Sequence, residues 1–267
     1  MEHANVDTAK TITHVGLCAG YGGIELGLKR VLPALRSVAL CEIEAFAIAN
    51  LVAKMEAGLM DAAPVWTDLK TFPWESFRDR VDILTGGYPC QPFSAAGKRA
   101  GKDDPRHLWP WIADGIAAMR PRVCFFENVE GHISLGLSSV ISDLEEMGYK
   151  VSWGIFSASE CGAPHQRKRV FVLADDQSER IQRVWSAWQQ ESHLSSQQVL
   201  SGRSGTRTDW SDGTTEPILV RMADGGSDWV DTMRLLGNGV VPATAALAFT
   251  TLLNEQRNTR HLAGDAS

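Results

Sequence analysis

One cysteine stands where a nucleophile could be presented to a cleft. Cys90 lies between Pro89 and Pro92, in residues 86–97, a stretch too rich in glycine and proline for a helix or strand. The apolar residues 81–84 before it predict a buried strand. A cysteine at the carboxyl end of a strand, on a backbone stiffened by prolines, can act as a nucleophile. An isolated cysteine is more often a small core residue, so its role depends on the rest of the chain.

A glycine-rich turn and a distant acidic residue favour a nucleoside cofactor. Glycines let the backbone approach a ligand closely, and the helix that follows offers its N-terminus to an anionic group. Glu42 ends the predicted second strand, 22 positions after Gly20, and could accept hydrogen bonds from two ribose hydroxyls. The turn lacks the full G-x-G-x-x-G pattern, so NAD and a plain tight turn both stay open. Its residues are Ala19, Gly20, Tyr21, Gly22 and Gly23.

Two more carboxylates follow predicted strands or helices. Asp68 lies in a loop, where it could accept a hydrogen bond from the exocyclic amine of an adenine, or simply be a solvated charge or a helix cap. Glu127 follows the apolar residues 122–126, at the edge where an open α/β sheet binds its ligands. Partial burial there should raise its pKa, so that it can donate a proton. A structural role in capping the next loop is the alternative for Glu127.

Two arginines form a candidate anion clamp. Arg167 and Arg169 are two positions apart at the start of a predicted strand, so we expect them to point to the same face. A pair of guanidinium groups suits a carboxylate or a phosphate.

The elements that must position these residues alternate between strand and helix. This order predicts an α/β fold, a doubly wound and mostly parallel sheet with helices on both faces. The predicted strands are residues 14–18, 37–41, 81–84, 122–126, 150–156 and 169–174, and the predicted helices are residues 24–32, 44–57, 107–119, 137–147 and 242–253.

Composition narrows the class of protein. The chain has 267 residues, 44% hydrophobic and 22% charged, which is ordinary for a soluble globular protein. A net charge of −6 argues against a broadly basic coat for nucleic acid but allows a local basic cleft. No apolar run approaches the ~18 residues of a membrane span, and residues 1–13 lack a signal core. Five cysteines without zinc-ligand spacing indicate free thiols in a cytoplasmic protein, and no metal is expected.

The chain divides into one large domain and an irregular insert. We expect a catalytic domain at residues 14–174, an insert poor in aliphatic residues at 175–228, and a segment at 229–253 that returns to the large domain. Residues 1–13 and 254–267 are expected to be tails. The polar, basic residues 97–106 suit either a lid that closes over phosphates or an ordinary loop.

Together these motifs resemble the DNA (cytosine-5)-methyltransferases, a family of Rossmann-like, class I enzymes dependent on S-adenosylmethionine (SAM). The resemblance covers nearly the whole chain outside residues 175–228, and its compactness is similar to that of bacterial and phage enzymes. The matching motifs stand in the family's order: residues 19–23, Glu42, Asp68, residues 89–91, residues 127–129, residues 166–169 and residues 237–240.

The resemblance implies a chemistry for each motif. Cys90 would attack carbon 6 of a flipped-out cytosine in duplex DNA, so that carbon 5 accepts the methyl group of SAM. Glu127 would engage ring nitrogen N3 and the exocyclic amine, while Arg167 and Arg169 would hold the base and its phosphate. The cofactor would be bound by residues 19–23, Glu42, Asp68, Pro89 and Asn238, and the DNA contacted by Gln91, Ser94, Lys98 and Arg99.

The chain departs from the family at two places. Cys18 stands where many relatives carry an aromatic side chain against the adenine, a role that Tyr21 or Trp66 could take over. The insert at residues 175–228, where target recognition is expected, is short and acidic. Two rival functions therefore stay open: methylation of cytosine in tRNA, and a non-catalytic binding paralogue.

The same resemblance suggests partners and location. We expect a monomer that binds double-stranded DNA and no membrane, in the cytoplasm of a bacterial or phage-infected cell. A companion restriction endonuclease is a further expectation.

Overall fold

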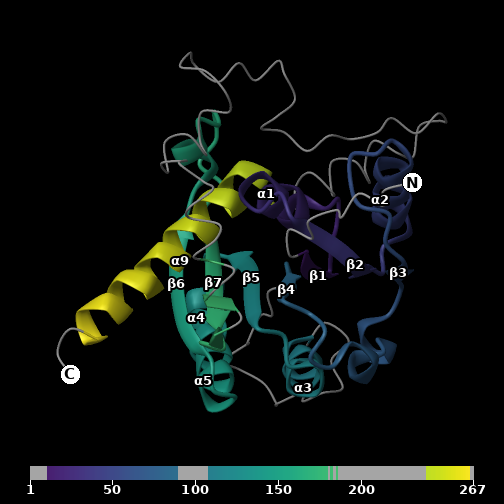
Figure 1. Cartoon of the computed structure of the whole chain (residues 1–267). Coiled ribbons are helices and arrows are strands. Elements are labelled where there is room, and N and C mark those ends of the chain that lie inside the picture. The colour runs from purple at the N-terminus through teal and green to yellow at the C-terminus, as the bar shows by residue number, and fades with distance from the viewer. Residues whose placement is uncertain (1–10, 90–107, 180, 183–184, 186–238, 265–267) are drawn as a thin grey trace, which may run out of the picture.

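A seven-stranded sheet forms the middle layer of the fold. The structure, a computed structural model, describes residues 11–89, 108–179, 181–182, 185 and 239–264 (Figure 1). The strands lie in the order β3-β2-β1-β4-β5-β7-β6, and β7 runs in the direction opposite to that of the other six. Their bounds are β1 Ile12–Leu17, β2 Leu35–Cys41, β3 Val65–Trp66, β4 Ile83–Gly86, β5 Val123–Val129, β6 Lys150–Phe156 and β7 Arg169–Asp175.

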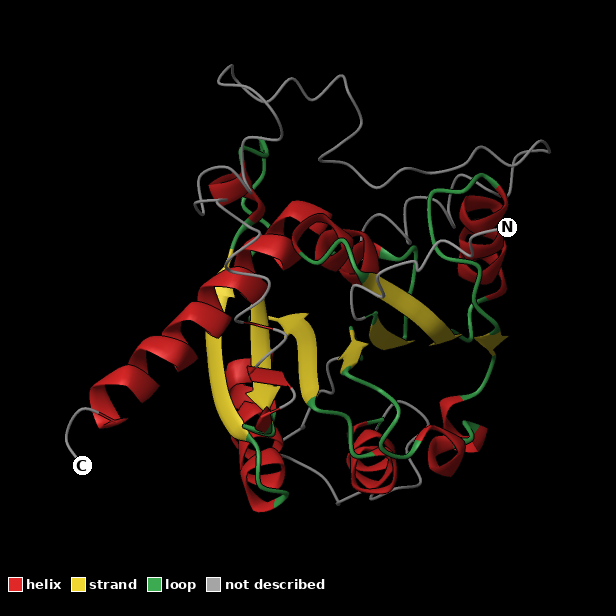
Figure 2. Ribbon diagram, viewed as in Figure 1, coloured by secondary structure: helices red, strands yellow, loops and turns green. Residues whose placement is uncertain are grey.

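Helices cover both faces of this sheet (Figure 2). On one face lie α1 (Gly23–Val31), α2 (Ala45–Glu56) and α9 (Pro242–Gly264). On the other face lie α3 (Trp109–Met119) and α5 (Leu137–Glu146), which the short α4 (His132–Leu135) precedes. The predicted doubly wound α/β fold with a mostly parallel sheet is therefore confirmed.

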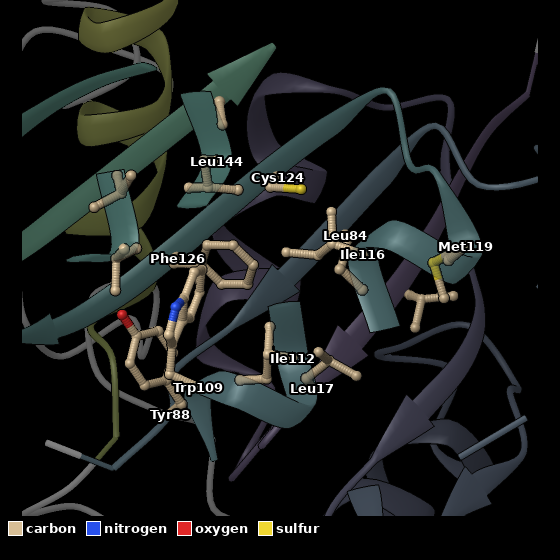
Figure 3. Close-up of a cluster of buried hydrophobic side chains, with 14 of the residues drawn as sticks. Leu17, Leu84, Tyr88, Trp109, Ile112, Ile116, Met119, Cys124, Phe126 and Leu144 are labelled. Carbon is tan, nitrogen blue, oxygen red and sulfur yellow. The ribbon is translucent and has the colours of Figure 1, made fainter. Parts of the chain in front are cut away.

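Two apolar layers join the helices to the sheet. In one, α3 turns Ile112 and Ile116 onto strand residues that include Leu84 and Phe126 (Figure 3). In the other, Phe249 of α9 packs edge-on against Phe125 of β5, with ring centroids 5.3 Å apart. Because the central strands β1, β4, β5 and β7 are buried on both faces, they carry nearly continuous apolar runs, which is why they can be found in the sequence.

The last helix is longer than its apolar pattern indicates. The sequence predicts an end near Leu253 and a polar tail from residue 254, but α9 continues to Gly264. Gln256 is buried in this extension, and its amide nitrogen Nε2 lies 3.0 Å from the Lys150 carbonyl and 3.1 Å from that of Leu173. The amide nitrogen is satisfied by backbone acceptors of β6 and β7, so a helix with a polar sequence can still pack on the sheet.

The predicted boundary at residue 175 is set too early. Asp175 is the last residue of β7, and Ile181 and Trp185 are fully buried in the same apolar layer as Phe249. The large domain therefore includes at least these residues. Residues 186–238, which hold most of the predicted insert, lie outside the described part of the chain.

No helix among the described residues combines the length and the apolar character that a bilayer crossing requires.

The crossing of α1 and α9 depends on a glycine. A Cβ atom added at Gly27 of α1 would lie 2.4 Å from the carbonyl oxygen of Pro242 and 2.9 Å from Cβ of Ala245. In an exposed helix, alanine is about 1 kcal/mol more favourable than glycine. Here the clash with backbone should reverse the sign.

We predict that Gly27→Ala lowers the free energy of unfolding by about 1–3 kcal/mol, because overpacking outweighs helix propensity. Urea denaturation of the variant and the wild type measures the difference. Gly131→Ala is the matched control, since a Cβ at Gly131 meets no atom within 4 Å. A Gly27→Ala protein as stable as the wild type would show that the helix crossing is looser than described.

Candidate cofactor cavity and active site

The carboxyl ends of the parallel strands surround a cavity of about 650 Å³. Its wall comes from distant parts of the chain: the turns after β1, β2 and β3, the segment after β4, Leu108, Glu127 of β5, and residues 239–240 before α9. An open parallel sheet brings these strand ends to one edge, which explains why the predicted motifs meet there.

The glycine turn is shaped for close approach. Gly20 and Gly22 have positive φ values of 55° and 86°, which few other residues adopt without strain. Gly23 opens α1, and a Cβ there would lie 2.1 Å from the carbonyl oxygen of Val240. The predicted turn at residues 19–23 therefore meets the C-terminal segment directly, with no room for a side chain between them.

Glu42 binds the two turns together. Its Oε2 accepts a hydrogen bond from the Gly20 amide at 2.7 Å, and its Oε1 accepts from the amides of Ile43 and Glu44 at 2.8 Å each. Each carboxylate oxygen has a second lone pair, so Glu42 can still accept from a ligand hydroxyl. The carboxylate thus fixes the turn after β1 against the turn after β2.

Asp68 also lies in the cavity wall, beside Lys70. Its Oδ1 accepts from the Lys70 amide at 2.9 Å and caps a short 3-10 helix at Leu69–Thr71. Asp68 therefore does cap a helix. Because Asp68 also lies on the cavity wall, its other carboxylate oxygen is left for a ligand.

Of the two aromatic residues proposed to replace one at position 18, Tyr21 belongs to the cavity wall and Trp66 does not. The Tyr21 side chain is buried beneath the turn, where its hydroxyl donates to the Val240 carbonyl. The indole of Trp66 packs edge-on against Phe72, and Trp66 is not part of the cavity wall. The wall also contains Cys18, together with Ile43 and Phe46, two apolar residues that were not predicted to be site residues. Because Ile43 directly follows Glu42, its place in the sequence could have predicted that it lines the cavity.

Glu127 and Arg169 form a buried ion pair beside the cavity. Arg169 Nε lies 2.8 Å from Glu127 Oε1, and Glu127 is 6% exposed. Burial raises the pKa of Glu127 to about 7, against the lowering effect of Arg169 and Arg167. At neutral pH this carboxyl can therefore exist in both protonation states, as the sequence argument expected.

Arg167 also acts on Glu127, but it is not aligned with Arg169 along a strand as we predicted. It precedes β7 and has a positive φ of 38°, so the strand alternation that we expected to align it with Arg169 does not apply. Its guanidinium Nη2 donates to the Gly239 carbonyl, yet its charge still lowers the pKa of Glu127. Arg167 therefore joins the C-terminal segment to the carboxylate site.

The residues before Cys90 are fastened to the end of β5 and to α4. The Asn128 amide nitrogen Nδ2 donates to the Tyr88 carbonyl at 3.0 Å, and the Tyr88 hydroxyl lies 3.0 Å from His132 Nε2. A Cβ at Gly87 would come within 3.2 Å of Glu127 Oε2, so glycine permits the close approach. Pro89 is exposed and lines the cavity.

Six predicted site residues lie outside the part of the chain that the structure describes. They are Cys90, Gln91, Ser94, Lys98, Arg99 and Asn238. Within the described part, no cluster of histidine, cysteine and acidic residues could hold a metal ion.

Comparison with known proteins identifies the family. The family model of the C-5 cytosine-specific DNA methylases matches residues 12–246. Type II methyltransferase M.NaeI of Lentzea aerocolonigenes is 34% identical over 164 residues, which cover 60% of this chain and 39% of that protein. M.NgoMIV of Neisseria gonorrhoeae is 34% identical over 166 residues, covering 61% of this chain and 51% of that protein. The chain thus spans about half the length of the curated relatives it matches.

Solved structures agree on the fold. S. pombe Dnmt2 methyltransferase superposes with a TM-score of 0.60 at 18% identity, covering 92% of this chain and 99% of that one. A mutant of Spodoptera frugiperda DNMT2 gives a TM-score of 0.54 at 21% identity, over 63% of this chain and 51% of that one. With the sequence match across residues 12–246, the chain belongs to the family of C-5 cytosine-specific DNA methylases.

Proposed function

We propose that this chain transfers a methyl group from SAM to carbon 5 of a cytosine in duplex DNA, through a Cys90 adduct at carbon 6. One observation carries the proposal: the cavity that the glycine turn and Glu42 enclose also reaches Glu127 and Pro89, the residue before Cys90. A cofactor site and a carboxylate suited to proton transfer therefore share one space.

The residues of the cavity fit SAM. A volume of 650 Å³ lies within the range of about 300–1,000 Å³ that is usual for small-molecule sites. Glu42 would hold the ribose hydroxyls and Asp68 the adenine amine, and the start of α1 would face the methionine carboxylate. When bound, SAM supplies an electrophilic methyl group on a positively charged sulfur.

Cys90 and Glu127 divide the chemistry on the base. The Cys90 thiolate forms a bond to carbon 6, and Glu127 donates a proton to N3, so that electron density moves to carbon 5. After methylation, a solvent base takes the carbon 5 proton, which expels the thiolate from carbon 6, and N3 returns its proton to Glu127, so that the ring and the enzyme are restored. Arg169 holds Glu127 in place, and Arg167 steadies the same site beside the Gly239 carbonyl. The cytosine must leave the duplex stack to reach these groups.

Substrate and partners follow from the family and its relatives. The family is specific for cytosine in DNA by name, and the relatives named above are Type II methyltransferases. We therefore favour duplex DNA over tRNA as the substrate. We also favour a cytoplasmic monomer that acts beside a restriction endonuclease. Gln91, Ser94, Lys98 and Arg99 are the proposed DNA contacts, and Asn238 and Pro89 complete the cofactor site.

Methyl transfer from labelled SAM tests the proposed function. We predict incorporation into duplex DNA and none into tRNA, and a loss of at least about 10⁴-fold in Cys90→Ala, because no other residue replaces the nucleophile. Cys161→Ala is the matched control, a buried cysteine outside the cavity wall that should keep activity. Incorporation only into tRNA, or full activity of Cys90→Ala, would refute the proposal.

The ion pair between Glu127 and Arg169 leads to a separate prediction about how kcat depends on pH. If protonated Glu127 is required, the kcat for methyl transfer should fall as pH rises through the pKa near 7. Arg169→Gln removes a charge that lowers this pKa, so the falling limb should move to higher pH by roughly 1 unit, with kcat reduced about 100-fold. Full pH–rate profiles of both proteins measure the shift.

Arg78→Gln serves as its control, since Arg78 pairs with Glu75 on the surface. Its profile should match that of the wild type. A falling limb that stays in place in Arg169→Gln would mean that Glu127 is not the group that titrates.

A further inference from the structure

Glu25 is a buried carboxyl group that the proposed chemistry does not use. It is the third residue of α1, 5% exposed, and it lines the same cavity as Glu42 and Glu127. Gly16 of β1 makes room for it, because a Cβ there would lie 2.2 Å from Glu25 Oε1. The sheet therefore accommodates a carboxyl group under the start of α1, where an apolar side chain would be expected.

One oxygen of Glu25 is tied to the sheet by a chain of polar side chains. The Thr85 hydroxyl donates to Oε1 at 3.5 Å, His14 Nε2 lies 2.9 Å from the Thr85 oxygen, and His14 Nδ1 lies 2.9 Å from Ser37 Oγ. If Thr85 donates to Glu25, it accepts from Nε2–H, and Nδ1 accepts from Ser37. His14 is fully buried and its pKa is lowered to about 3, so this series of hydrogen-bonded side chains carries no positive charge.

The other oxygen, Oε2, is buried and has no hydrogen-bond partner in the described part of the chain. An unpaired buried carboxylate is costly, and burial accordingly raises the pKa of Glu25 to about 7. A cation in the cavity would remove this cost.

Among the described residues, the charged groups around Glu25 do not supply that cation. Lys54 of α2 is the cation whose charge lowers the pKa of Glu25, but its ammonium donates to the Tyr21 carbonyl at 2.5 Å and makes no salt bridge with Glu25. Lys29 lies with Glu25 on a smaller cavity of about 120 Å³, where it pairs with Asp61 at 3.4 Å. Glu42 adds negative charge and opposes ionisation.

We propose that Glu25 recognises the positive charge of SAM from the sheet side of the cavity and so favours the methyl donor over its product. This inference rests on the proposed function. The product, S-adenosylhomocysteine, keeps the adenosine, the amine and the carboxylate but has a neutral sulfur. Because the two ligands differ in the charge of the sulfur, a carboxylate in the wall of this cavity should favour the one that is positively charged there.

Isothermal titration calorimetry of the whole chain with SAM and with S-adenosylhomocysteine tests this role without any turnover. We predict that Glu25→Gln weakens SAM binding about tenfold and product binding about twofold or less, since only one ligand carries the sulfonium charge. Glu56→Gln, an exposed carboxylate at the end of α2, is the charge-matched control and should change neither affinity. An unchanged ratio of the two affinities in Glu25→Gln would overturn the inference.

The pH dependence of binding provides a second test. Because the carboxyl becomes charged as pH rises through about 7, the preference for SAM over the product should increase several-fold from pH 6 to pH 8. Glu25→Gln should lose this increase, while the titration of Lys54, whose pKa is lowered to about 8, remains in both proteins. A preference that is flat with pH would contradict the role of Glu25. A wild type that binds neither ligand would instead refute the proposed cofactor.

Discussion

The contact between Glu127 and Arg169 is the one on which the candidate active site depends. It exists because β7 runs against the other strands: its first residue, Arg169, lies opposite Val129 at the carboxyl end of β5. A parallel β7 would place this arginine at the far edge of the sheet. Removal of Arg169 would leave a buried carboxyl without its counterion, which is far more costly than loss of a surface pair. The direction of β7 therefore determines whether the positive charge of Arg169 lies beside Glu127.

The cofactor cavity depends on a second set of long-range contacts. Val240 comes from the end of the chain, but its carbonyl receives the Tyr21 hydroxyl and lies where a side chain at Gly23 would stand. Arg167 holds the neighbouring Gly239. Helix α9 then packs against α1 and the β6–β7 pair, which keeps this wall in place. The first turn and the last helix of the domain therefore form the site together.

The sequence predicted the parts of this arrangement that follow from local pattern. Apolar runs gave the fold class and six of the seven strands, missing the two-residue β3. The glycine turn, Glu42, Asp68 and Glu127 were found on the cavity wall or beside it. It failed where side-chain bonding overrides pattern. Gln256 looks like tail sequence until its backbone partners on β6 and β7 are known. Glu25 reads as a solvated charge on α1, because nothing local shows that Gly16 makes room for it.

The central claim is that Cys90 attacks a cytosine held beside Glu127, and a trapping experiment tests it most directly. The chain is incubated with labelled SAM and duplex DNA that contains 5-fluorocytosine, whose fluorine blocks the final elimination. The account predicts a labelled protein–DNA adduct on a denaturing gel, lost in Cys90→Ala and retained in Cys161→Ala. SAM binding without any adduct on mixed-sequence DNA would contradict it.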